Sequence, residues 1–190
     1  MTTSARRITQ RAVSIAATLA IVLTGGIARP FADTPKPCAV RFDDRGLSRL
    51  AQQGLARSAT LRALFAELDR ARVIVYTSIS RDLGAGVGGR VRFIGVGGDG
   101  WRFLRLEVDD RRTRVELLAI LGHELQHASE IARATEVVDE ASMAAFYDRI
   151  GFASVTAAER ALPTRARNFE TQAAIDVERR VFSELFGDRW

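Results

Sequence analysis

Residues 120–129 read ILGHELQHAS, and this stretch decides the fold that we expect for the chain. It holds the only two histidines among 190 residues, His123 and His127, with Glu124 directly after the first. Four residues turn a helix through about 400°, so the two imidazoles lie on one face, one turn apart. This spacing suits two ligands of a single Zn²⁺, and the neighbouring carboxylate is placed to act as a general base on water. The stretch therefore predicts a zinc site on a helix.

Signals on both sides extend this helix from Thr113 to about Ala134. Thr113 and Glu116 have the spacing of a capping box at its start. The residues beside the histidines are apolar or small, as a buried helix requires: Ile120, Leu121, Leu125 and Ala128. Gly122 costs the helix about 1 kcal/mol of propensity and lets another backbone come close. We therefore expect a buried helix packed tightly against a neighbour.

The residues before this helix have the pattern of a small β-sheet. Residues 91–96 (VRFIGV) and 101–108 (WRFLRLEV) flank the glycine-rich residues 97–100, which predicts a β-hairpin. Residues 73–77 (VIVYT) form a β-branched run and predict one further strand. The expected sheet thus consists of a hairpin plus one strand.

Helical periodicity surrounds these strands. A weak helix is expected over 44–56, and Ser58 is placed to cap a second, whose apolar residues are Leu61, Leu64, Phe65 and Leu68. Two more helices are expected over 136–149, ending at Gly151, and over 169–186. The last has an apolar stripe at every fourth residue: Phe169, Ala173, Val177, Val181 and Leu185. The fold class is therefore α+β, with a short sheet packed on the histidine-bearing helix and on further C-terminal helices.

The N-terminal region has the pattern of a targeting segment. Residues 12–28 carry no charge and follow three arginines, Arg6, Arg7 and Arg11, as in a secretory signal peptide. Small residues favour cleavage after Ala28 or Ala32. We expect a signal peptide over 1–28, a proline-rich linker over 29–42 and one domain over 43–190. The mature protein would be periplasmic or secreted; an uncleaved N-terminal transmembrane anchor is the alternative.

Composition excludes several classes of protein. The net charge is +5, but three arginines lie in the targeting segment, so the remainder has 25 basic and 23 acidic residues. Because basic and acidic residues are almost equal in number there, this part of the chain has no large excess of positive charge for binding nucleic acid. Cys38 is the only cysteine, which excludes an internal disulfide and any zinc site built from cysteine pairs. We interpret it as a free thiol at the end of the leader.

Three glycines, Gly84, Gly86 and Gly89, match the spacing G-x-G-x-x-G. A dinucleotide site needs a helix directly after these glycines, because the pyrophosphate binds at the N-terminus of that helix. Here the pattern that follows is a strand, so we expect a loop that leads into the hairpin.

The stretch ILGHELQHAS resembles the zinc signature of the zincin metallopeptidases, and the order of hairpin, active helix and later helices is similar to theirs. The resemblance is close over the ten residues 120–129 and only general over about residues 73–186. It implies that His123 and His127 bind zinc and that Glu124 is the catalytic base. It also implies that the strand over 101–108 borders the cleft and pairs with the backbone of a substrate.

The third zinc ligand has to come from elsewhere in the chain. A third histidine is absent, which excludes the metzincin pattern and implies a carboxylate, as in the gluzincin branch. Gluzincins supply it from a later helix, commonly with small residues one turn further on. Glu170 lies 43 residues after His127 on a later predicted helix, and Ala173 and Ala174 fit that habit. Asp139 and Glu140 remain alternatives. Glu130 lies on the histidine helix itself. Its position suits contact with a side chain that ligates the metal, rather than with the metal itself.

The sequence thus predicts an exported zinc-dependent metallopeptidase that acts on peptide or protein substrates. Zinc would be held by His123, His127 and Glu170, with Glu124 as general base. The alternative is a non-catalytic zincin-like module that binds a metal or a partner, but such modules often lose the glutamate. The group that stabilises the oxyanion stays open among four candidates: Tyr147, Tyr76, Arg165 and Arg167.

Overall fold

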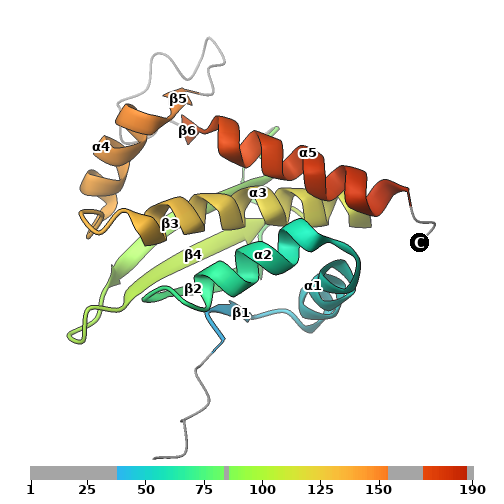
Figure 1. Ribbon diagram of the computed structural model, residues 1–190, viewed down its shortest axis with the longest axis horizontal. Coiled ribbons are helices and arrows are strands. Elements are labelled where there is room, and N and C mark those ends of the chain that lie inside the picture. Colours follow the sequence, from blue (N-terminus) through green and yellow to red (C-terminus); the bar gives the residue numbers. More distant parts are fainter. Residues whose placement is uncertain (1–37, 84–85, 154–168, 188–190) are drawn as a thin grey trace, which may run out of the picture. The chain divides into compact units, whose positions relative to one another are not determined.

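The computed structural model describes residues 38–83, 86–153 and 169–187 (Figure 1). The described chain has the expected α+β fold. Its elements in order are β1 (Val40–Phe42), α1 (Arg45–Arg57), α2 (Ala59–Leu68), β2 (Val73–Ile79), β3 (Gly89–Val96), β4 (Arg102–Val108), α3 (Arg114–Arg133), α4 (Glu140–Ile150), β5 (Phe152–Ala153), β6 (Phe169–Glu170) and α5 (Gln172–Phe186).

The main sheet has four strands in the order β1-β2-β4-β3. The predicted hairpin is present as the antiparallel pair β3–β4, whereas β1–β2 and β2–β4 are parallel pairs. Along β4 burial alternates, and Leu104, Leu106 and Val108 are fully buried toward the helices. Helices α2 and α3 lie across this face of the sheet (Figure 1). Strand β3 forms one edge of the sheet, beside the histidine-bearing helix.

Helix α3 is fixed at both ends by side chains. Thr113 and Glu116 form the predicted capping box, and both of its hydrogen bonds are present. At the other end, the buried guanidinium of Arg102 on β4 donates to the carbonyl oxygens of Ile131 and Ala134, each at 2.7 Å, and of Ala132 at 2.6 Å. A cation that satisfies the last carbonyls of a helix also opposes its macrodipole. The helix is therefore tied to the centre of the sheet.

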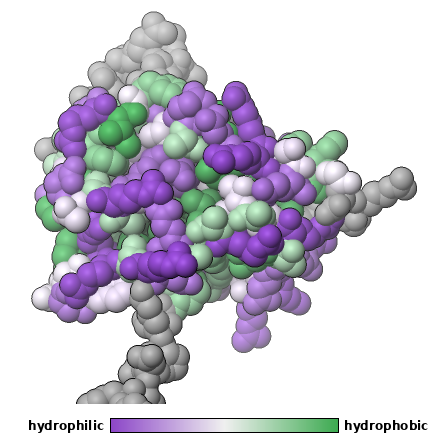
Figure 2. Space-filling model, viewed as in Figure 1, coloured by the Kyte–Doolittle hydropathy of each residue, from purple (hydrophilic) through white to green (hydrophobic). Residues whose placement is uncertain are grey.

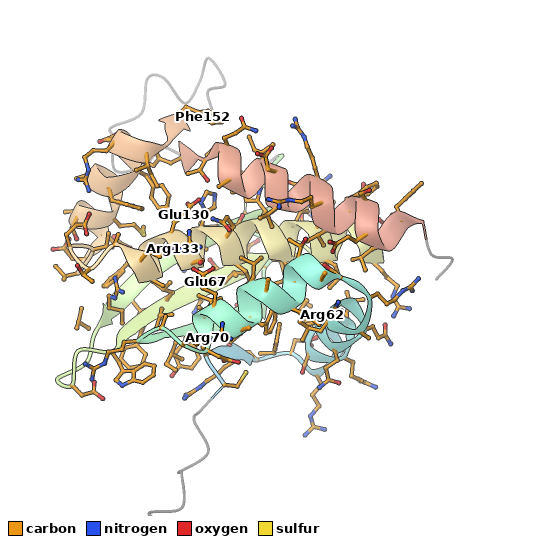
Figure 3. The ribbon with its side chains drawn as sticks, in the orientation of Figure 1. Arg62, Glu67, Arg70, Glu130, Arg133 and Phe152 are labelled. Carbon is orange, nitrogen blue, oxygen red and sulfur yellow. The ribbon has the colours of Figure 1, made fainter. Side chains whose placement is uncertain are left out.

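An ion pair at the surface joins α2 to α3, and a buried serine caps the start of α2. Glu67 of α2 and Arg133 of α3 face each other (Figure 3), and two guanidinium nitrogens donate to the carboxylate at 2.7 and 2.8 Å. Ser58 caps α2 as expected, because its hydroxyl accepts from the amide of Leu61. On this side of the protein, hydrophilic side chains cover much of the surface (Figure 2).

Helix α5 packs directly on α3. A Cβ atom on Gly122 would lie only 3.0 Å from Cγ2 of Val181 and 3.5 Å from Cγ1 of Val177, so the glycine permits the expected close approach, here to valine side chains. The buried stripe of α5 consists of Ala174, Val177, Val181 and Leu185. The expectation that Ala173 belongs to this stripe is wrong: it is exposed, and Ala174, three residues before Val177, takes its place. The reason is that a strict four-residue spacing drifts off one face of a helix with 3.6 residues per turn.

Three predicted boundaries are corrected. The linker over 29–42 extends too far, because Val40–Phe42 pairs with β2 and adds a fourth strand to the expected hairpin plus one strand. The helix expected over 136–149 starts only at Glu140, since Asp139 and Ser142 form a capping box there. The helix expected from 169 starts at Gln172, because Phe169–Glu170 pairs antiparallel with β5.

The predicted signal peptide over 1–28 and most of the linker lie outside the described residues. Within the described ranges, no helix has both the length and the apolar character that a membrane span requires.

Candidate metal centre

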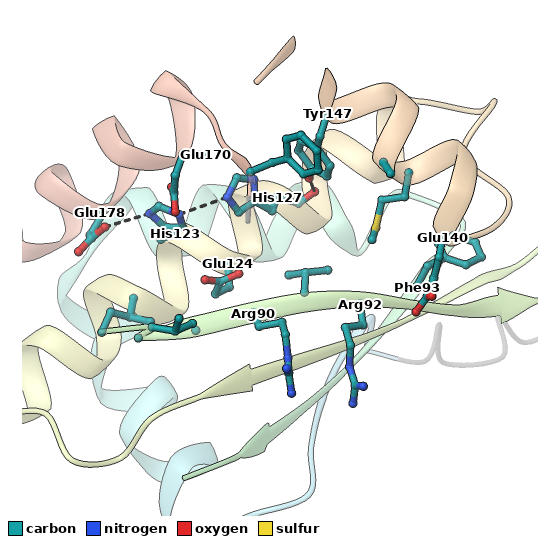
Figure 4. Close-up of a pocket in the computed structure, with 18 of the residues that line it drawn as sticks. Arg90, Arg92, Phe93, His123, Glu124, His127, Glu140, Tyr147, Glu170 and Glu178 are labelled. Atoms are coloured by element: carbon teal, nitrogen blue, oxygen red, sulfur yellow. Dashed lines mark hydrogen bonds and ion pairs between the residues drawn. The ribbon is translucent and has the colours of Figure 1, made fainter. Parts of the chain in front are cut away.

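Three side chains from two distant parts of the chain converge on one point. His123 and His127 lie on α3, and Glu170 lies in β6 just before α5 (Figure 4). The Nε2 atoms of the two histidines are 3.2 Å apart, and Oε2 of Glu170 is 2.9 Å from Nε2 of His123. One candidate ligand atom from each residue lies within 4.8 Å of the others. Such a cluster is the arrangement that a divalent cation requires.

The other ring nitrogen of each histidine contacts a carboxylate. Nδ1 of His123 is 2.9 Å from Oε2 of Glu178 on α5, and Nδ1 of His127 is 3.0 Å from Oε2 of Glu130 on α3. A carboxylate at Nδ1 fixes the proton of a neutral imidazole there. When the rings are neutral, the lone pairs of both Nε2 atoms therefore point to the same place.

Glu130 connects the two parts of the centre. Its Oε2 holds His127, while its Oε1 accepts from Oγ1 of Thr171 at 2.8 Å and from Nε2 of Gln126 at 3.2 Å. Thr171 caps the N-terminus of α5 by accepting from the amide of Ala174. Because Thr171 directly follows Glu170, the contact of Glu130 with His127 is linked to the position of Glu170.

The charges around the histidines favour a cation. Burial lowers the pKa of His123, but its ion pairs with Glu170 and Glu178 outweigh burial and raise the pKa to about 10. Burial also opposes the charge on Glu130, yet its hydrogen bond with His127 brings the pKa of this carboxyl below its ordinary value. The pKa of Glu178 is lowered mainly by its bond with His123. The centre is thus arranged to stabilise positive charge at the point where the three ligand atoms meet.

Glu124 is buried next to the cluster, and its carboxylate lies toward strand β3 (Figure 4). Burial raises the pKa of this carboxyl, although the nearby His127 and His123 oppose the rise. A general base is most effective when its pKa is close to the working pH, and burial shifts that of a glutamate in this direction.

Glycines bring strand β3 close to the histidine helix. A Cβ atom on Gly89 would lie 2.6 Å from Cγ and Oε1 of Glu124, and one on Gly88 would lie 2.8 Å from Cδ1 of Ile120. The positive φ of Gly86, 84°, is a second reason for glycine in this segment. As predicted, a strand follows the G-x-G-x-x-G pattern, although its first glycine lies outside the described residues. These glycines make room for the side chains of α3.

The cluster opens into a cleft of about 1400 Å³. One wall is the edge strand β3 with residues 86–88 before it, and the other walls come from α3, the start of α4, and α5. The strand that borders the cleft is therefore β3. The expectation that residues 101–108 form this border is wrong, because β4 lies inside the sheet between β2 and β3.

The candidates for the oxyanion group have different surroundings. Tyr147 lines the cleft, but its hydroxyl donates to the carbonyl oxygen of His127 at 3.1 Å, and its ring stacks on Phe169 at 6.2 Å between centroids. Burial raises the pKa of Tyr147 well above its ordinary value. Tyr76 stacks on Phe103 on strand positions that face away from α3. Two further candidates, Arg165 and Arg167, lie outside the described residues.

The structure brings Glu170, but neither alternative carboxylate, to the two histidines. It comes from strand β6, two residues before α5, rather than from the helix itself as predicted. The carboxylate of Asp139 caps α4, and Glu140 lies at the far end of the cleft (Figure 4). Sequence reasoning missed Glu178. No local pattern pointed to it, because its contact with His123 depends on how α5 packs on α3.

The sequence matches no family model, and neither a curated protein nor a solved structure was found to be similar to the chain.

Proposed function

We propose that this protein is a zinc-dependent metallopeptidase of the zincin type, exported from the cell. The observation that carries the proposal is the convergence of His123, His127 and Glu170, with the buried carboxylate of Glu124 beside them. Two imidazoles and one carboxylate are a usual ligand set for catalytic zinc, because three protein ligands leave one coordination position open.

The donor set fits a bound metal ion. Oε2 of Glu170 is buried and accepts no hydrogen bond within the described residues, although Nε2 of His123 is only 2.9 Å away. With His123 neutral, this buried carboxylate oxygen has no donor, which is costly unless a cation satisfies it. Both imidazoles also have their Nδ1 atoms occupied by carboxylates, which is how proteins orient histidines toward a metal.

Each residue of the site would then have a separate role in the reaction. When bound, Zn²⁺ would supply Lewis acidity for water and for the carbonyl group of the substrate. Glu124 would take the proton of the attacking water and deliver it to the amine that leaves. Glu130 and Glu178 would hold the two imidazoles in place. The free edge of β3 would bind the backbone of an extended peptide by strand addition.

The experiment that tests this proposal replaces Glu124 by glutamine, which keeps the size of the side chain and removes its basicity. We expect Glu124→Gln to fold and to bind zinc about as tightly as the wild type. Its hydrolysis of denatured proteins should fall by at least about 10²-fold, the usual lower bound for loss of a positioned general base. Removing zinc with a chelator should abolish hydrolysis by the wild type, and adding zinc should restore this hydrolysis. Unchanged hydrolysis by Glu124→Gln would exclude this mechanism.

The alternative is a module that binds a metal or a partner without turnover. It would be favoured if the zinc-loaded wild type cut nothing in a broad panel of denatured proteins and peptide libraries. The retained Glu124 is the feature that favours the enzyme.

Export is part of the proposal and has its own test. The uncharged residues 12–28 behind three arginines support it. Mass spectrometry of the protein from its native host should find an N-terminus near Arg29 or Asp33. An intact Met1 in a soluble cytoplasmic fraction would contradict export.

A further inference from the structure

The far end of the cleft contains a carboxylate that the proposed chemistry does not use. Glu140 is the first residue of α4 and lines the cleft at the Phe93 end of β3, away from the histidines (Figure 4). In the part of the chain that is described, this carboxylate has neither a hydrogen bond nor an ion pair. A charged group at the wall of a substrate cleft without a partner of its own is available to a ligand.

The neighbouring charged groups are already engaged. Asp139 accepts from the amide and the hydroxyl of Ser142, both at 2.7 Å, and thereby caps α4. Arg92 extends to the other side of β3 (Figure 4), where its guanidinium is 3.5 Å from the carboxylate of Glu107. Neither group neutralises Glu140. Among the described residues, Glu140 therefore has no cationic partner at this end of the cleft.

The wall beside this carboxylate is apolar. Phe93 lies near Glu140 (Figure 4), and Val138 and Met143, which are close to Glu140 in the chain, also line the cleft. Val138 is 51 % exposed. A lysine or arginine side chain has an aliphatic stem that packs on such a surface while its charged end reaches a carboxylate. An acidic side chain would meet repulsion there, and a short polar one would reach neither feature.

The direction of β3 determines where in a peptide this side chain would stand. Along β3, Gly89 lies beside Glu124, and Phe93, four residues later, lies near Glu140. A peptide added to this edge in the commoner antiparallel direction has its N-terminal part at Phe93 and its C-terminal part at Gly89. Residues before the scissile bond then lie on the side of Glu140.

We propose that Glu140 selects substrates with a lysine or arginine side chain on the N-terminal side of the scissile bond. This inference rests on the proposed peptidase function, because it concerns the same cleft. Since Glu140 is exposed, the preference should be modest, about fivefold over an uncharged side chain of equal length, and should weaken as ionic strength rises.

The test compares fluorogenic peptides that carry lysine, norleucine or glutamate at each of the three positions before and after the cleaved bond. The wild type should show a kcat/KM about fivefold higher for lysine than for norleucine at one position before the bond. Glu140→Gln should abolish this preference, and Glu140→Lys should reverse it in favour of glutamate. Asp148→Asn is the matched control, because this exposed acid of α4 does not line the cleft. It should keep the wild-type preference.

A second readout does not depend on turnover. Fluorescence polarisation of the same labelled peptides on zinc-loaded Glu124→Gln should show tighter binding of the lysine peptide, and adding Glu140→Gln should remove the difference. If the wild type cuts no peptide but this difference is present, the peptidase function fails while the selection by Glu140 stands. A lysine preference that survives Glu140→Gln would overturn the inference. A preference that depends on Glu140 but falls after the bond would overturn the assigned direction.

Discussion

The two halves of the candidate metal centre differ in how they are built. His127 is held from within its own helix, by Glu130 one turn later, and that carboxylate also bonds with Gln126 and Thr171. His123 is held by Glu178 of α5, whose side chain is 42 % exposed, compared with 8 % for Glu130. Within the described residues, a network of buried hydrogen bonds supports the His127 half but not the His123 half.

The difference shows which half depends on tertiary packing. The position of Glu130 relative to His127 follows from helix geometry, since residues three apart share a face. Glu170 and Glu178 reach His123 only because α5 lies on α3, at the contact of Val177 and Val181 with Gly122. A change in the packing of α5 should therefore loosen the His123 half while it leaves the contact of Glu130 with His127 intact.

The largest effect is expected from removing the ligands themselves. His123→Ala or His127→Ala should abolish stoichiometric zinc binding, and Glu170→Ala should weaken it by about 10-fold or more, because one of only three protein ligands is lost. Isothermal titration calorimetry with zinc measures each change. If Glu170→Ala left the affinity unchanged while Asp139→Ala or Glu140→Ala destroyed it, the ligand assignment would be wrong.

The comparison of the halves is tested directly by Glu130→Gln and Glu178→Gln. Removing a carboxylate that orients a zinc-ligating histidine usually costs about 10- to 100-fold in affinity. We expect Glu130→Gln near the upper end of this range, because it also disturbs Thr171 beside Glu170, and Glu178→Gln near the lower end. Metal competition with a chromophoric chelator gives both affinities. Equal losses would show that the two halves are equivalent after all.

The packing of α5 is probed by Gly122→Leu. The larger side chain would press on Val177 and Val181, and overpacking of this kind costs about 1–3 kcal/mol of unfolding free energy. Zinc affinity should fall with it, since Glu170 and Glu178 would move away from His123. The control is Gly187→Ala at the end of α5, where an added Cβ meets no atom within 4 Å. Wild-type zinc affinity in a folded Gly122→Leu protein would argue against this coupling.

The smallest effect is expected for Tyr147→Phe, which removes the hydroxyl bound to the carbonyl oxygen of His127. Loss of one buried hydrogen bond should lower the unfolding free energy by about 1 kcal/mol, as measured by urea denaturation. Hydrolysis should change by only a few-fold, because this hydroxyl supports the backbone of the His127 half. A fall in kcat of about 10²-fold with unchanged stability would instead identify Tyr147 as the group that stabilises the oxyanion.

Local patterns predicted most elements because the forces that set them act over a few residues. The capping box at Thr113, the cap at Ser58 and the hairpin around residues 97–100 are all present where the sequence indicates them. The pattern did not reveal that Val40–Phe42 is a strand, because three residues carry little periodicity and this strand is stabilised by pairing with β2. The start of α5 was also missed, since β6 ends at Glu170 through pairing with β5 and Thr171 then caps the helix.

The sequence by itself determined the part of the site that lies within one helix. The spacing of His123, Glu124 and His127 places them on adjoining positions of α3, and Glu130 follows from the same helical geometry. Only the tertiary structure decided which distant carboxylate joins them, that Glu178 supports His123, and that β3 rather than β4 borders the cleft. The physical reason is that helix geometry relates residues a few positions apart. A contact such as that of Glu170, 47 residues after His123, depends on how whole elements pack.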